Sequence, residues 1–320
     1  MTVRGNERDE RIGGKTVHFT NLDKVLWSKD GYTKGDLIGY YRAVARWLVP
    51  YLKDRPLTLQ RYPNGIDKGS FFEKNAPKGL PDWVPTALER SPESERGHIR
   101  YVVCNDEATL AYLANLAAIT LHAWISRTQS ADSPDFLLFD LDPWTGCSLQ
   151  TLARVALAVR DSLEGLRLKP AVKTTGGDGL HVMLRLRPGH SYASVRDFCE
   201  LVARAIAAEQ PNDVTLERMT AKRKRGRVYI DWVQIGRGKT IVPPFVVRAR
   251  PGAPVSMPIP WKIVEGWAKN SGVKAERALH RWTIENVPAL LRAGGDPWRA
   301  MMRSQQSLAS AVNRAKRVRK

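Results

Sequence analysis

The chain has 320 residues, of which 43% are hydrophobic and 26% charged, and 51 Lys+Arg against 32 Asp+Glu give a formal net charge of +19. This composition excludes a disordered chain and suffices for a large core, in one big domain or two lobes. Apolar stretches long enough to cross a membrane, about 18 residues, are absent, and the polar N-terminus is no secretion signal. Cys104, Cys147 and Cys199 match neither a disulfide framework nor a zinc-ligand pattern. We therefore expect a soluble cytoplasmic protein without a membrane partner.

The excess of positive charge predicts a polyanionic partner, with nucleic acid as the first candidate. An acidic membrane surface is the alternative, but the basic residues are not gathered on one amphipathic helix. Two clusters stand out, at 222–227 and in the C-terminal group Arg314, Lys316, Arg317, Arg319 and Lys320. Each is open to two interpretations, a phosphate contact or a solvated loop or tail.

In the first part of the chain, apolar periodicity predicts two helices and a strand. Thr33 with Asp36 three residues later approaches a capping box and marks a helix start. The expected elements are a helix at 33–52, a strand at 57–62, a turn at 65–69 and a long buried helix at 107–124.

The second part alternates strands and helices. Ser191 is a candidate N-cap. The expected elements are strands at 136–141, 171–175 and 181–186, helices at 149–163 and 191–208, and a strand at 228–233 with 240–247 as its hairpin partner.

Two carboxylates end the apolar strand at 136–141. Asp140 and Asp142 are two residues apart, so both project from one face of the strand. Like charges side by side repel each other, and a bound divalent cation would offset that repulsion. The alternative is that Asp142 caps the following turn while Asp140 is solvated or paired with an arginine.

Asp231 lies within another apolar strand, and a carboxylate placed there needs a partner. Three carboxylates at strand ends would suit a two-metal phosphoryl-transfer site. The segment from Thr174 to His181 is a Gly-rich turn between two strands, whose backbone amides could hold a phosphate with help from Thr175 and His181. Such turns are common, and a lone histidine is more often structural than a ligand contact.

Asp140-Leu141-Asp142, Thr175 to His181 and Tyr229-Ile230-Asp231 resemble, in this order, the three motifs of the archaeo-eukaryotic primase superfamily. The specific resemblance is to the polymerase domain of bacterial DNA ligase D, which acts in non-homologous end joining. Further matches extend over nearly the whole chain, at 20–27, 33–36, 61–65, 71–75, 113–116, 248–256 and 295–298.

The resemblance implies an α/β (α+β) fold with a mixed central sheet flanked by helices. We expect a flexible N-terminus at 1–15, one primase-polymerase domain at 16–303, and a basic tail at 304–320. Within the domain, an N-terminal lobe would occupy about 16–110 and a catalytic core about 111–303. The remaining residues leave no room for a ligase domain, so the expectation is a stand-alone polymerase.

The resemblance also implies roles for individual side chains. Asp140, Asp142 and Asp231 would hold two catalytic Mn²⁺ or Mg²⁺ ions. DNA contacts would come from Lys24 and Lys34 at the 5′-phosphate of a gap, and from Phe71 and Phe72 stacked on the template. Contacts to the incoming NTP or dNTP would come from His122, Thr175, His181, Gln234, Lys239 and Arg248.

The chain departs from the family pattern at two positions of the Gly-rich turn. Thr175 replaces a usual serine and keeps the hydroxyl, whereas Asp178 replaces a frequent lysine and reverses a charge. Three explanations stay open: the basic loop at 222–227 supplies the cation, Asp178 points away, or the nucleotide or metal preference differs.

The expected function is metal-dependent, template-directed addition of ribo- or deoxyribonucleotides to a DNA 3′ end at short gaps or double-strand breaks, with priming as a further activity. Expected partners are gapped or broken DNA, a Ku-like end binder and a separate DNA ligase. We expect a nucleoid-associated monomer. The first alternative is a non-catalytic DNA-end-binding scaffold. A phosphohydrolase or nucleotide-sugar transferase is the second, but it explains neither Asp231 nor the positive charge.

Overall fold

The computed structural model describes residues 6–92 and 94–311, which divide into two compact units. Within these limits, unit 1 comprises Met1–Gln129, Thr240–Ser256 and Trp282–Gly295, and unit 2 comprises Ser130–Lys239, Met257–Arg281 and Asp296–Lys320. The chain therefore returns to unit 1 twice after leaving it. This arrangement differs from the expected lobes at 16–110 and 111–303, because long-range pairing of later segments decides the division. None of the helices of the described residues is long and apolar enough to span a membrane.

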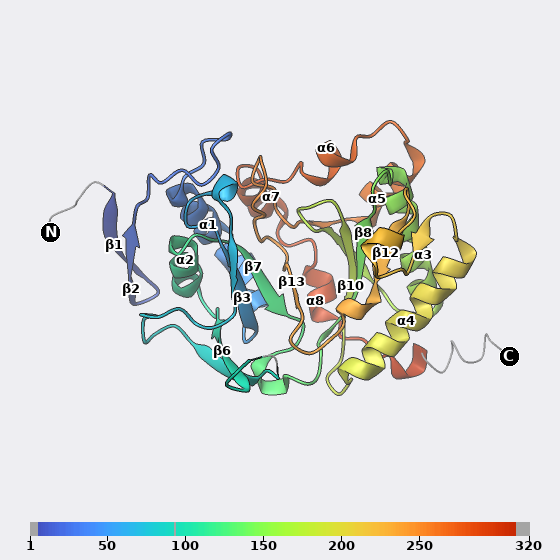
Figure 1. Cartoon of the computed structure of the whole chain (residues 1–320), viewed down its shortest axis with the longest axis horizontal. Coiled ribbons are helices and arrows are strands. Elements are labelled where there is room, and N and C mark those ends of the chain that lie inside the picture. Colours follow the sequence, from blue (N-terminus) through green and yellow to red (C-terminus); the bar gives the residue numbers. More distant parts are fainter. Residues whose placement is uncertain (1–5, 93, 312–320) are drawn as a thin grey trace. The chain divides into compact units, whose positions relative to one another are not determined.

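Unit 1 is built on an antiparallel sheet with strand order β13-β7-β3-β6-β5, to which β4 adds beside β3. Helices α1 and α2 pack against each other, and α2 also contacts β7 (Figure 1). The elements of unit 1 are β1 (Glu7–Ile12), β2 (Lys15–Thr20), α1 (Lys34–Leu52), β3 (Pro56–Arg61), β4 (Phe71–Glu73), β5 (Thr86–Arg90), β6 (His98–Val103), α2 (Glu107–Asn115), β7 (Ala118–Trp124), β13 (Thr240–Ile241) and α7 (Val287–Gly294).

The start of α1 is confirmed. Thr33 is the N-cap, its hydroxyl accepts from the Asp36 backbone N–H, and the Asp36 carboxylate accepts from the Thr33 backbone N–H. This reciprocal pair is a capping box, which satisfies donors that the first helical turn leaves unpaired. The helix then buries an apolar face that includes Leu37, Tyr41 and Leu48. Local capping and the 3.6-residue period together explain why the sequence alone located this helix.

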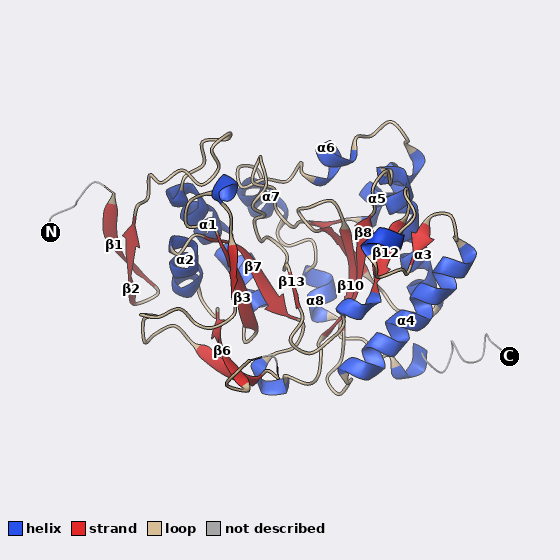
Figure 2. Cartoon of the chain, in the orientation of Figure 1, coloured by secondary structure: helices blue, strands red, loops and turns tan. Residues whose placement is uncertain are grey.

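Unit 2 has a mixed sheet with strand order β11-β12-β8-β10-β9-β14. Only the pair β11–β12 is parallel among the described strands of this sheet. Helices α3 and α4 pack on each other and against β8 (Figure 2). The elements are β8 (Phe136–Pro143), α3 (Leu149–Gly165), β9 (Ala171–Thr174), β10 (Leu180–Arg185), α4 (Tyr192–Glu209), β11 (Val214–Thr215), β12 (Val228–Asp231), β14 (Pro258–Ile259), α5 (Trp261–Lys269), α6 (Ala275–Leu279) and α8 (Arg299–Arg303).

Two predicted elements were wrong. The segment 107–124 is not one helix but α2 followed by β7, with a reversal at Ala117, whose φ is +54°. Most residues of the segment are buried and the others are half-buried, so its apolar period could not separate a helix from a strand. The segment 240–247 is not the hairpin partner of β12, because β13 pairs with β7 in unit 1 and β12 pairs with β8 and β11 in unit 2.

Both expected terminal regions are partly ordered. The supposedly flexible segment 1–15 contains β1, which pairs with β2 in a hairpin whose side chains Ile12, Val17 and Phe19 are buried. Of the expected basic tail at 304–320, Leu308 and Ala311 are buried, and the Gln306 backbone N–H donates to the Arg185 carbonyl oxygen, so residues 304–311 pack within unit 2. The cluster Arg314, Lys316, Arg317, Arg319 and Lys320 lies outside the described residues.

Candidate active site on the sheet of unit 2 and candidate DNA contacts on unit 1

The central strands of unit 2 bring acidic side chains from distant parts of the sequence into one row. Asp140 on β8 is the direct cross-strand partner of Asp231 on β12 and of His181 on β10. Directly opposed residues of an antiparallel pair lie on the same face, with Cβ atoms about 5 Å apart. Asp142, two residues along β8, projects from that face as well. The register therefore places the three predicted carboxylates together.

Two carboxylates of this row lie close to a neighbouring donor group. Oδ1 of Asp140 lies 3.2 Å from Nε2 of His181, and the Tyr229 hydroxyl donates to Oδ1 of Asp231 at 3.2 Å. The neighbour of Asp140 in this row is therefore the imidazole of His181.

Burial, followed by neighbouring negative charge, raises the proton affinity of Asp142 and Asp231. Loss of hydration, followed by the charges of Asp140 and Asp231, raises the pKa of Asp142 to about 7. Burial and the charge of Asp140 also raise the pKa of Asp231. Asp142 is nevertheless solvent-exposed, so solvent screens part of this penalty. A cation beside these oxygens would favour their ionised forms.

A divalent metal fits the donor chemistry of the row, because Mg²⁺ and Mn²⁺ prefer carboxylate oxygens. The side chains do not yet converge on one point. Among residues 6–92 and 94–311, no group of three or more His, Cys, Asp or Glu side chains is arranged to enclose a metal ion. Rotation of Asp140 away from His181 and of Asp231 away from Tyr229 would therefore accompany coordination.

The Gly-rich turn joins β9 and β10, as expected, next to this row. The Thr175 hydroxyl accepts from the backbone N–H groups of Gly177 and Gly179, at 3.1 and 3.3 Å, and so organises the turn from inside. Gly179 has no space for a side chain, since a Cβ there would lie 2.5 Å from the Leu141 carbonyl oxygen. The sequence therefore holds the turn close against β8.

Asp178 belongs to the electrostatic surroundings of the row. Its charge is among the causes that raise the pKa of Asp142, whereas the charge of Arg223 lowers it. Arg223 comes from the basic loop and stacks on Tyr229, with its guanidinium carbon 3.8 Å from the ring centroid. Of the three explanations for Asp178, these contacts favour compensation by the basic loop.

Two other predicted nucleotide contacts of unit 2 follow β12. Lys239 donates to the Val233 carbonyl oxygen at 2.6 Å, and burial lowers its pKa although the charge of Asp231 raises it. Gln234 ends the short helical turn Trp232–Gln234. Lys239 is thus electrostatically linked to the carboxylate row.

His122 and Arg248 are brought together in unit 1. Burial, followed by the charge of Arg248, lowers the pKa of His122 to about 3, so the imidazole is neutral at physiological pH. Its Nε2 is buried and has no hydrogen-bond partner among the described residues. A buried nitrogen of this kind is costly unless a ligand or water meets it, which fits a binding role.

The predicted template-stacking pair lies on β4 of unit 1. Phe71 and Phe72 are 45% and 60% exposed, which is unusual for phenylalanine. The guanidinium of Arg61 lies over Phe71, 5.3 Å from the ring centroid. The ring of Phe72 meets His122 edge to face, with centroids 5.5 Å apart. Exposed rings held in place by neighbours are suited to stacking.

Lys24 and Lys34 are also brought together. The bridge between Val25 and Thr33 places them side by side, and the Lys34 backbone N–H donates to the Lys24 carbonyl oxygen at 2.8 Å. The Lys34 ammonium donates to the Thr20 hydroxyl at 3.3 Å and the Asn115 carbonyl oxygen at 3.1 Å. Burial and the charge of Lys24 lower its pKa to about 8. Paired cations that repel each other are suited to bind a phosphate.

Sequence reasoning did not identify several neighbours of these sites. Tyr229 holds Asp231, and Nε2 of His280 lies 3.1 Å from the Gly177 carbonyl oxygen and 3.6 Å from Asp178. Lys173 is fully buried on β9 directly opposite His181. A lysine inside an apolar strand was a usable signal for Lys173, whereas the position of His280 depends on tertiary packing.

Comparison with known proteins identifies the family to which the chain belongs. The family described as "LigD, primase-polymerase domain" matches residues 33–298. Multifunctional non-homologous end joining protein LigD of Mycolicibacterium smegmatis is 33% identical over 260 residues, which cover 80% of this chain and 33% of that protein. Bifunctional non-homologous end joining protein LigD of Bacillus subtilis is 32% identical over 256 residues, covering 78% of this chain and 40% of that protein.

The polymerase domain of Mycobacterium tuberculosis ligase D, solved in complex with DNA, has the same mixed α/β fold, with a TM-score of 0.80 and 28% sequence identity. The similarity covers 93% of this chain and 100% of that one. The chain spans about a third of the length of the M. smegmatis relative and less than half of the B. subtilis one. By the matched residues 33–298 and by this structural likeness, the chain belongs to the LigD primase-polymerase domain family.

Proposed function

We propose that this protein is a metal-dependent, template-directed nucleotidyltransferase. It adds ribo- or deoxyribonucleotides to a DNA 3′ end at short gaps or double-strand breaks, in non-homologous end joining or gap repair, and also primes synthesis. The observation that carries the proposal is the cross-strand row of Asp231, Asp140 and His181 with Asp142 beside it. Membership of the family, whose relatives are named for end joining, supports it.

Asp140, Asp142 and Asp231 are the proposed ligands of two Mn²⁺ or Mg²⁺ ions, which would stabilise the charge on the attacking and leaving oxygens. The role of the chain itself is to hold these carboxylates ionised and in place. Arg223 favours the ionised form of Asp142, and the register of β8 and β12 fixes the backbone positions of the set.

The nucleotide is proposed to bind with its triphosphate near the Gly-rich turn. Thr175 orients the amides of Gly177 and Gly179, and His181 is a donor to phosphate once it is released from Asp140. Gln234, Lys239, His122 and Arg248 remain proposed nucleotide contacts. The neutral imidazole of His122 suits hydrogen bonding to an uncharged sugar or base group rather than to phosphate.

DNA is the proposed macromolecular partner, as for the M. tuberculosis domain solved with DNA. Lys24 and Lys34 are proposed to bind the 5′-phosphate of the downstream strand, and Phe71 and Phe72 to stack on the template. The net charge of +19 favours phosphate binding in general.

Primer extension on a singly gapped duplex tests the proposal. The reactions compare NTPs with dNTPs, Mn²⁺ with Mg²⁺, and a 5′-phosphate with a 5′-hydroxyl, for the wild type and Asp140→Ala. Extension that disappears in Asp140→Ala and weakens without the phosphate is the expected result. Salt-sensitive DNA binding without extension under all these conditions would instead establish the end-binding scaffold.

A further inference from the structure

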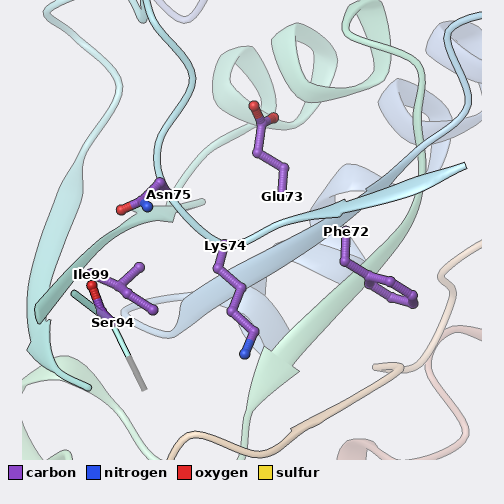
Figure 3. Close-up of a pocket in the computed structure, with 6 residues that line it drawn as sticks. All are labelled: Phe72, Glu73, Lys74, Asn75, Ser94 and Ile99. Carbon is purple, nitrogen blue, oxygen red and sulfur yellow. The ribbon is translucent and has the colours of Figure 1, made fainter. Parts of the chain in front are cut away.

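Unit 1 contains a pocket beside β4, and of its lining residues only Phe72 has a role above. Its volume is about 420 Å³, and it is lined by Phe72, Glu73, Lys74, Asn75, Ser94 and Ile99 (Figure 3). This volume falls in the range of pockets that bind small organic ligands, roughly 300–1,000 Å³. A phosphate group alone would leave most of the space unfilled.

The strand direction decides which groups face the pocket. Phe72 and Lys74 are two residues apart and project to one side of the chain, whereas Glu73 projects to the other side (Figure 3). The Glu73 carboxylate binds Arg61 at 2.9 Å. The pocket is therefore bordered by an aromatic ring and an ammonium group, while the carboxylate is neutralised elsewhere.

Asn75 and Ser94 supply a donor and an acceptor in fixed positions. Oδ1 of Asn75 accepts from the Arg100 backbone N–H at 3.3 Å, which directs the amide nitrogen of Asn75 as the donor. The Ser94 hydroxyl donates to the His98 carbonyl oxygen at 2.9 Å, so its oxygen acts as an acceptor. Ile99 adds an apolar wall and is 7% exposed.

These features match the chemistry of a nucleobase. A base has a flat face that stacks on an aromatic ring and an edge that carries donors and acceptors. Phe72 is 60% exposed, and its contact with His122 holds the ring in place. The Lys74 ammonium suits the phosphate that accompanies the base.

We propose that this pocket binds an unpaired base of single-stranded nucleic acid. The base is a template base that stacks on Phe72, next to the one that stacks on Phe71, and it turns out of the strand into the pocket. That identification of the strand rests on the proposed function, whereas the chemistry of the pocket does not. The pocket would thereby fix the path of the template beyond the position being copied.

Equilibrium binding of gapped DNA with one abasic template position at a time tests the proposal on the wild-type protein. Fluorescence anisotropy is measured in EDTA without nucleotide, so that the result does not depend on catalysis. Removal of the base that occupies the pocket should weaken binding roughly 5- to 150-fold, the range for loss of one stacked base. The neighbouring base on Phe71 should give a second sensitive position.

Ile99→Trp fills the pocket and should remove sensitivity at the pocket position only. Leu88→Trp is the matched control: Leu88 pairs with Arg100 while Ile99 pairs with Glu89, so the same ring is added on the opposite face of the β5–β6 pair. Asn75→Asp is a second variant, which removes the amide donor but keeps the oxygen that accepts from Arg100. Asn75→Asp should reduce the sensitivity at the pocket position and keep the hydrogen bond from the Arg100 backbone N–H.

The proposal would be overturned if, in the wild type, removal of template bases weakened DNA binding at one position only. Sensitivity retained at every position in both Ile99→Trp and Asn75→Asp would also overturn it. Failure of the proposed function is distinguishable from failure of this proposal, because a protein without polymerase activity would still show two sensitive template positions in this binding assay.

Discussion

The ammonium group of Lys34 should control recognition of a 5′-phosphate in a pH-dependent way. Lys34 is only 5% exposed, and burial together with the charge of Lys24 lowers its pKa to about 8. A terminal phosphate has its second pKa near 6, so its charge stays constant over the pH range in which Lys34 titrates. The preference for a phosphorylated gap should therefore weaken as the pH rises above about 8.

The size of the effect follows from the contact that is lost. A hydrogen bond to a charged group contributes about 1.5–3 kcal/mol, which corresponds to roughly a 10- to 150-fold preference for the 5′-phosphate over a 5′-hydroxyl. Above the pKa of free Lys34, this preference should fall by up to about tenfold for each pH unit. Lys34→Met should lose the preference and its pH dependence together.

The same shift has a consequence for stability. The pKa of Lys34 is lower in the folded chain than in the unfolded one, so the charged form is unfavourable in the fold. The cost is present below about pH 8 and disappears as the pH rises toward the unfolded value. Lys34→Met should therefore raise the free energy of unfolding near pH 7 by about 1–2 kcal/mol, less than the full shift, because its hydrogen bonds to Thr20 and Asn115 are lost.

Fluorescence anisotropy with phosphorylated and unphosphorylated gapped DNA, at constant salt between about pH 7 and 9, measures the preference. Lys53→Met, at the other end of α1, is the control and should leave it unchanged. The reasoning is refuted if the wild-type preference is constant over this range, or if Lys34→Met retains it.

Three further variants test other parts of the structure. Asp142→Asn should raise the free energy of unfolding in EDTA near pH 8 by about 1–2 kcal/mol, after allowance for solvent screening, because the folded chain no longer ionises a carboxyl whose pKa is about 7. Urea unfolding near pH 5 should show a smaller gain, since the cost of ionising Asp142 accumulates between about pH 4 and 7. Phe72→Ala should weaken gapped-DNA binding roughly 5- to 150-fold by anisotropy, and unchanged affinity would remove Phe72 from the DNA surface. Thr33→Ala should lower the free energy of unfolding by about 1 kcal/mol through loss of the capping box, with unchanged urea stability as the contrary result.

Local patterns were sufficient where an element has a sequence signal of its own, such as an N-cap, an apolar run or a Gly-rich turn. The strand at 136–141, the helix begun by Thr33 and the Gly-rich turn were all predicted from sequence, and all are present. Because the side-chain period of a strand is two, the shared face of Asp140 and Asp142 was also predictable.

Long-range pairing decided what the sequence could not show. The split of 107–124 into α2 and β7 depends on the sheet of unit 1, in which β7 pairs with β3. Placement of β13 beside β7 likewise depends on register with a strand more than a hundred residues away, and it takes Arg248 into unit 1 with His122.

The candidate site shows the same limit. Nothing in the spacing of the motifs reveals that Asp231 and His181 both pair with Asp140, since that depends on the order of three strands. The contacts of Arg223 with Tyr229, and of His280 with the Gly-rich turn, arise from loops that fold back on the sheet. The charge of Arg223 lowers the pKa of Asp142, but the sequence alone did not show that the basic cluster at 222–227 lies beside the row.

Single-turnover addition of one nucleotide to a gapped duplex tests the central claim most directly. The wild type is compared with Asp231→Asn and with Asp197→Asn, an exposed aspartate on α4 that serves as control. A loss of at least about a hundredfold in Asp231→Asn, with unchanged DNA affinity and a normal rate in Asp197→Asn, is the predicted result. A normal rate in Asp231→Asn would contradict the assignment of the carboxylate row as the catalytic centre.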